Sequence, residues 1–97
     1  MFLPAVIRFN ATAESVQKEK RLERMAHAMG LASAGDIPEA IRDMNARLGL
    51  PTGLAAMGVT EALFDDIIKG AMADHCHKTN PRIATPEEYR DMLAQSL

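Results

Sequence analysis

Residues 36–49, DIPEAIRDMNARLG, carry the clearest structural signal in the chain, because both ends of a helix can be recognised in them. Asp36 can cap a helix, Pro38 fits its first turn, and Glu39 can reach back to complete a capping box. Gly49 stands where a helix closes with a left-handed residue. The apolar positions of this stretch follow a helical spacing: Ile41, Met44 and Leu48. The sequence therefore predicts a helix with one buried side.

Upstream of this stretch, similar signals predict two more helices. The first ends near Asn10. The second covers residues 13–29, with Thr12 placed to act as its N-cap and Gly30 placed to take the left-handed conformation after its last turn. This part of the chain shows no alternating strand pattern.

Downstream, two further helices follow. One starts after the N-cap residue Thr60 and has an apolar side made of Leu63, Ile67, Ala71 and Met72. The last begins with Thr85 as cap, Pro86 in the first turn and Glu88 at the capping-box position. Its inward residues are Tyr89, Met92 and Leu93. Residues 1–97 are thus expected to form a single all-α segment of about five helices.

Composition limits the classes of function. The chain has 97 residues, of which 47% are hydrophobic and 25% charged, which fits one small globular core. A net charge of −2 and a pI near 5.9 argue against nucleic-acid binding. The basic residues of the run 18–24 alternate with Glu19 and Glu23, which indicates a solvated helix face.

No targeting or membrane segment is recognisable. The apolar start, Met1 to Phe9, lacks a basic lead, and Pro4 and Arg8 interrupt it. One cysteine excludes an internal disulfide and fits a reducing compartment, so a cytoplasmic location without membrane contact is expected. Because the chain opens on apolar residues without a cap, we expect it to be a piece of a longer domain.

The sequence Asp74-His75-Cys76-His77 holds most of the groups that could bind a metal, and His27 is the only other histidine. Consecutive residues of a helix diverge by about 100°, so at most two of these side chains are expected to share an ion. A helix end with histidines near carbonyls or solvent is the favoured alternative.

Two other features have a plain and a functional interpretation. Cys76 between two histidines could be a nucleophile, but a buried, inert thiol is favoured. The seven methionines could form a pliable binding surface, but core filling is favoured because five lie in expected helices. No glycine-rich phosphate loop is present.

Four separate stretches, in order, resemble the closing region of iron-containing alcohol dehydrogenases. These are residues 3–10 (LPAVIRFN), 41–54 (IRDMNARLGLPTGL), 57–59 (MGV) and 73–82 (ADHCHKTNPR). In the last stretch the family typically shows an acidic residue, a cysteine and then Asn-Pro-Arg. The resemblance covers essentially the whole chain.

The resemblance implies an all-α C-terminal domain that follows an NAD(P)-binding domain. In that family an Asp and three His hold iron or zinc, which acts as a Lewis acid on the alcohol oxygen. The family's ligand motifs lie upstream of its Leu-Pro helix, so His27, His75 and His77 are not assigned as ligands, and no catalytic or metal-binding residue is expected in this chain. Only Cys76 carries over, as a residue that lines the nicotinamide and substrate pocket, while Asn80 and Arg82 match a structural turn.

Three hypotheses of function remain. The chain is either an inactive section of an NAD(P)-dependent alcohol dehydrogenase, a helical interaction module without catalysis, or a section whose activity returns when a separate upstream chain is added. A fragment of a maleylacetate reductase is the alternative within the same superfamily. No cofactor is expected in this chain alone. Exposed apolar helix faces are expected to make it a homo-oligomer.

Overall fold

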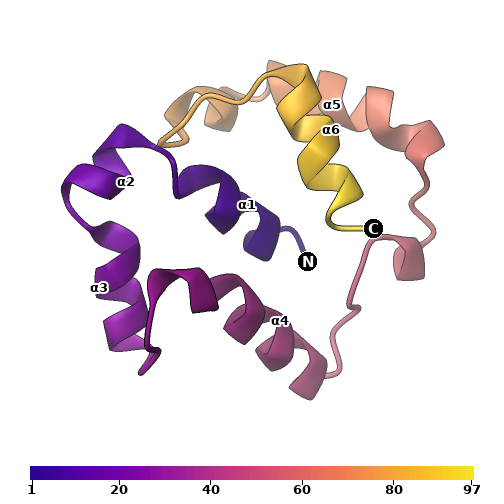
Figure 1. Cartoon of the computed structure of the whole chain (residues 1–97). Coiled ribbons are helices and arrows are strands. Elements are labelled where there is room, and N and C mark those ends of the chain that lie inside the picture. The colour runs from indigo at the N-terminus through magenta and orange to yellow at the C-terminus, as the bar shows by residue number, and fades with distance from the viewer.

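The computed structural model describes residues 1–97, and its only secondary structure is helical (Figure 1). The elements follow in the order α1 (Leu3–Asn10), α2 (Glu14–Lys18), α3 (Arg21–Ala28), η1 (Ala34–Asp36), α4 (Ile37–Arg47), η2 (Ala55–Met57), η3 (Glu61–Leu63), α5 (Phe64–Ala73), η4 (His75–Thr79) and α6 (Pro86–Ala94), where η denotes a 3-10 helix. The expected all-α class is confirmed. No helix has the length and apolar character needed to cross a lipid bilayer.

The helix expected at residues 13–29 is in fact two helices. Lys20, between α2 and α3, takes the left-handed conformation with φ 50°, which ends one helix before the next begins. Thr12 is not the N-cap; Ala13 holds that position, and the Thr12 hydroxyl donates to the Phe9 carbonyl at 3.1 Å. Gly30 closes α3 as expected, with φ 73°.

The N-terminal capping of helix α4 differs from the expected capping. The Asp36 carboxylate accepts hydrogen bonds from the Ser33 amide and hydroxyl, both at 3.0 Å, so the capping residue is Ser33 and the turn η1 precedes the helix. Glu39 pairs with Arg42 at 3.0 Å rather than reaching back. Gly49 takes φ 70° after the last turn, as expected. Similarly, α5 is preceded by the turn η3, and the Thr60 side chain makes no capping bond.

The buried sides of α4 and α5 differ from the expected ones. Helix α4 buries Ile41 as expected, together with Ile37, whereas Met44 and Leu48 are 42% and 66% exposed. Helix α5 buries Phe64 and Ile68 instead of the expected side. The expectation that methionines fill the core is also wrong, because five of them are exposed: Met25, Met29, Met44, Met57 and Met72.

Helix α1 connects two parts of the molecule. It packs against α4 and against α6, and α5 packs against α6 (Figure 1). The buried residues form three small clusters: Ile7, Ala26, Ile37 and Ile41; Leu54, Phe64, Ile68 and Leu93; and Ala5, Ala84 and Met92. Because α1 supplies Ile7 to the first cluster and Ala5 to the third, it holds both parts together.

The end of the chain returns to the loop before η2. The expected capping box of α6 is confirmed, since Thr85 and Glu88 bond each other's backbone amides at 2.9 and 3.2 Å. After α6, the carbonyls of Ser96 and Leu97 accept bonds from the amides of Leu54 and Ala55 at 2.7 and 3.2 Å. These bonds fix α6 beside α5 and so shape the site described next.

Candidate functional site

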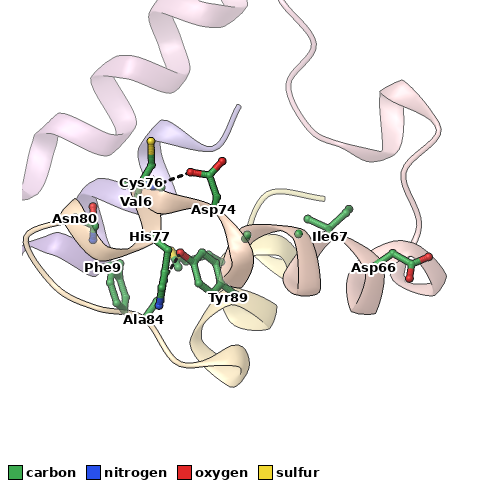
Figure 2. A pocket seen from close by; sticks show the side chains of 13 residues that line it. Val6, Phe9, Asp66, Ile67, Asp74, Cys76, His77, Asn80, Ala84 and Tyr89 are labelled. Atoms are coloured by element: carbon green, nitrogen blue, oxygen red, sulfur yellow. Dashed lines mark hydrogen bonds between the residues drawn. The ribbon is translucent and has the colours of Figure 1, made fainter.

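An open cleft of about 540 Å³ lies between α1, α5, η4 and α6 (Figure 2). Its lining is mostly apolar: Val6, Phe9, Asp66, Ile67, Gly70, Ala71, Asp74, Cys76, His77, Asn80, Ala84, Tyr89 and Met92. A second, wholly apolar hollow of about 280 Å³ shares Val6, Ile67, Ala71, Tyr89 and Met92 with it. Apolar walls with a few polar groups are the usual character of small-molecule sites.

The segment after α5 forms the polar edge of the cleft. Asp74 leaves the helix with an extended backbone, φ −73° and ψ 138°, and its carboxylate accepts a bond from the Cys76 amide at 2.7 Å. This cap starts the 3-10 helix η4, which Thr79 ends by donating to the Cys76 carbonyl at 3.0 Å. The short turn presents His77 to α6 and Cys76 to the outer rim.

Asn80 and Arg82 anchor this turn to the rest of the fold. The side chains of Asn80 and Asn10 form a reciprocal amide pair at 2.7 and 3.1 Å, and Asn80 also donates to the Arg82 carbonyl. The Arg82 guanidinium lies 4.2 Å from the Phe9 ring centre and pairs with Glu88. These contacts confirm the structural role expected of both residues.

Cys76 is exposed, so the expectation of a buried thiol is wrong. Its pKa is raised, because the Asp74 carboxylate accepts a hydrogen bond from the thiol and repels a thiolate. Conversely, the bond from the Cys76 amide lowers the pKa of Asp74. A thiol held in its protonated form is a poor nucleophile. The predicted place of Cys76 beside a nicotinamide stays a prediction, although the residue does line the cleft.

The expectation that at most two side chains of residues 74–77 converge is also wrong. One ligand atom each from Asp74, His75 and Cys76 lie within 4.8 Å of one another, because this backbone is not an α-helix. The three side chains are exposed. They do not match the set of one Asp and three His that the resemblance implies, since His27 lies on α3 and His77 contacts Tyr89 instead. The donors that converge in this chain therefore do not reproduce the ligand set that the resemblance implies.

The contact between His77 and Tyr89 has no counterpart among the sequence patterns. The His77 Nδ1 lies 3.0 Å from the Tyr89 hydroxyl, and the ring centres are 5.8 Å apart. Both side chains are half-buried and line the cleft. The residues are twelve positions apart on different helices, so only the return of α6 against η4 brings them together. A hydrogen-bonded polar pair thus lies beside the apolar residues that line the cleft.

The whole chain is similar to known proteins. Residues 1–97 match the family described as Fe-containing alcohol dehydrogenase family, C-terminal. A 4-hydroxybutyrate dehydrogenase from Cupriavidus necator is 55% identical over 95 residues, which cover 98% of this chain and 25% of the relative. An NAD-dependent methanol dehydrogenase from Bacillus methanolicus is 31% identical over 106 residues, covering 98% of this chain and 26% of the relative.

The chain thus spans about a quarter of the length of these relatives. No solved structure matches it significantly. The order of the matching motifs, the all-α fold and the match over every residue agree with one another. The chain therefore belongs to the iron-containing alcohol dehydrogenase family and corresponds to its C-terminal region.

Proposed function

We propose that this chain is the C-terminal helical section of an NAD(P)-dependent, metal-dependent alcohol dehydrogenase. In the whole enzyme a hydride passes from the carbinol carbon of an alcohol to the nicotinamide ring, and the hydroxyl proton is released, which yields an aldehyde. Both relatives are dehydrogenases, which supports this function over that of a maleylacetate reductase. The relative at 55% identity suggests short hydroxy acids such as 4-hydroxybutyrate as the substrate class.

The observation that carries the proposal is the open cleft of about 540 Å³ with Cys76 at its rim. Its volume lies within the usual range for small-molecule sites, and its walls come from α1, α5 and α6. In this proposal the cleft forms one wall of the space where substrate and nicotinamide meet. Cys76 contributes to that wall and takes no part in proton or hydride transfer.

We propose that these 97 residues do not catalyse the reaction by themselves. Its three histidines do not converge, and it has no glycine-rich loop for a dinucleotide. Iron or zinc supplies Lewis-acid chemistry when bound to the enzyme, and we assign its ligands and the dinucleotide-binding residues to the enzyme outside these 97 residues. What this chain contributes is an apolar wall that excludes water from the reacting groups.

A chimera tests the proposal. The matching C-terminal quarter of the C. necator 4-hydroxybutyrate dehydrogenase is replaced by this chain, and the formation of reduced nicotinamide is followed with 4-hydroxybutyrate. We expect the chimera to be active, and both this chain and the shortened relative to be inactive. A chimera that folds, by circular dichroism, but is no more active than the shortened relative would refute the proposal.

The interaction-module hypothesis remains the second candidate, because large apolar side chains are exposed over several helices. It differs from the first in one result: the isolated chain would form a closed oligomer of fixed size. A continuous increase in size with concentration would instead indicate faces that lack their covering partner.

A further inference from the structure

The contact between His77 and Tyr89 leaves one hydrogen-bond donor unused in either tautomer of the histidine. If the Tyr89 hydroxyl donates to Nδ1, then Nε2 carries a proton. If instead Nδ1 donates to the hydroxyl oxygen, the hydroxyl proton is free. The pair therefore always retains one N–H or O–H group beyond its own bond at 3.0 Å.

In the tautomer that protonates Nε2, the remaining donor is exposed. The pair's mutual bond is the only side-chain hydrogen bond of either residue, and no buried side-chain nitrogen or oxygen in the chain lacks a partner. The unpaired Nε2 of His77 must therefore be accessible rather than buried. His77 lines the cleft next to Tyr89 (Figure 2), so a molecule in the cleft can contact its side chain.

Other polar groups near the cleft are already engaged. Both ends of the Asn80 amide are bonded, to Asn10 and to the Arg82 carbonyl. The Arg82 guanidinium is neutralised by Glu88 and bonds Thr12. Asp74 accepts from Cys76 on the outer rim, and Asp66 lies at the far end of the drawn site from His77 (Figure 2). Among the side chains that line the cleft, only His77 and Tyr89 retain a nitrogen or oxygen donor that no other group accepts.

We infer that His77 and Tyr89 bind the carboxylate of a short hydroxy acid whose methylene chain lies along the apolar wall of the cleft. This inference rests on the proposed function and names the residues that select the substrate. Val6, Ile67 and Ala71 provide apolar contacts for two or three methylene groups, and the polar pair stands at one end of them. The role of the pair is specificity, since it distinguishes an acid from a neutral alcohol of the same length.

Ligand titrations followed by two-dimensional NMR on this chain test the inference. The two ligands are 4-hydroxybutyrate and butane-1,4-diol, which differ in a carboxylate and have the same number of carbons. We expect the acid to bind about tenfold more tightly than the diol, as one hydrogen bond to a charged group allows. Its shifts should appear at the amides of residues 67–71 and 76–80.

Variants locate the effect. His77→Gln and Tyr89→Phe should reduce the preference for the acid, while His27→Gln, which makes the same change on the exposed side of α3, should leave it unchanged. Equal binding of acid and diol, no binding of the acid, or a preference that survives His77→Gln would overturn the inference. A chimera that oxidises neutral alcohols without preferring the acid would overturn it as well, while leaving the proposed dehydrogenase function intact.

Discussion

At the scale of single residues, Asp74 and Cys76 control each other's protonation. The carboxylate accepts from the thiol and repels a thiolate, so the pKa of Cys76 is above its ordinary value. Since alkylation requires the thiolate, the exposed thiol is expected to react slowly near neutral pH and faster as the pH rises through its pKa.

Asp74→Asn should lower the pKa of Cys76 and increase its rate of alkylation by iodoacetamide several-fold at about pH 8. The curve of alkylation rate against pH should move as a whole to lower pH. Asp43→Asn removes an exposed carboxylate on α4 and serves as the control, with no change expected. An unchanged profile for the Asp74 variant would show that the carboxylate does not hold the thiol in its protonated form.

Gly53 is the residue at which the chain end and the central loop approach most closely. A Cβ atom built there would clash with the backbone of Leu97, which is held in place by the bonds from Leu54 and Ala55 to Ser96 and Leu97. Gly53→Ala must therefore displace the segment that bonds Leu54 and Ala55. We expect a loss of about 1–3 kcal/mol in the free energy of unfolding, measured by urea denaturation.

Gly70→Ala is the matched control for this substitution. Gly70 lies within α5, and a methyl group added there would have no neighbouring atom within 4 Å, so the same change should stabilise the helix by up to about 1 kcal/mol. If the two variants shifted stability in the same direction, the close approach at Gly53 would not be the cause.

At the scale of elements, the break between α2 and α3 depends on one strained residue. Lys20 takes φ 50°, a conformation that costs an L-residue roughly 1 kcal/mol and that glycine adopts freely. Lys20→Gly should therefore raise the urea midpoint slightly. Arg24→Gly, an exposed position inside α3, should lower stability by about 1 kcal/mol. Equal losses in both variants would contradict a left-handed residue at position 20.

Elements that depend on local signals could be predicted from the sequence, whereas the break at Lys20 could not. Thr85 and Glu88 form the expected capping box because both partners lie within four residues, and Gly30 and Gly49 close their helices for an equally local reason. Lys20 carries no such local signal, since lysine is ordinarily a helix former.

Burial is harder to predict than helix position. The apolar residues around the start of α5 lie on two sides, and the pairs Leu63 with Ile67 and Phe64 with Ile68 have the same helical spacing, so periodicity alone cannot choose between them. The packing partner, α6, decides between the two sides. The pair of His77 and Tyr89 escapes prediction for the same reason, because its contact depends on tertiary packing.

At the scale of the whole molecule, the chain forms a thin layer. Its extents are 38 × 32 × 18 Å, and its radius of gyration is 14.2 Å. A compact domain of this length has a radius of gyration of about 12.5 Å. Helices in such a layer keep a side in water, which accounts for the exposed apolar residues on α3, α4 and α5.

We therefore expect the isolated chain to self-associate, as the exposed apolar faces indicate. Light scattering after size-exclusion chromatography should give a mass above that of the 10.6 kDa chain, and the mass should fall on dilution. Leu63→Glu, on the open side just before α5, should shift the chain toward the monomer, whereas Ala62→Glu adds the same charge at the neighbouring exposed position with less effect. A monomer at every concentration would refute this expectation.

The division of the core into three small clusters also determines how the chain responds to temperature. The heat capacity of unfolding follows the apolar area that becomes hydrated, and here much of that area is in water before unfolding starts. The isolated chain should therefore have a heat-capacity change below the roughly 12–15 cal/mol/K per residue of compact domains. We therefore expect a flat stability curve and a broad melting transition. A binding partner that covers the exposed apolar faces would sharpen the melting transition. Calorimetry would therefore detect the binding of such a partner.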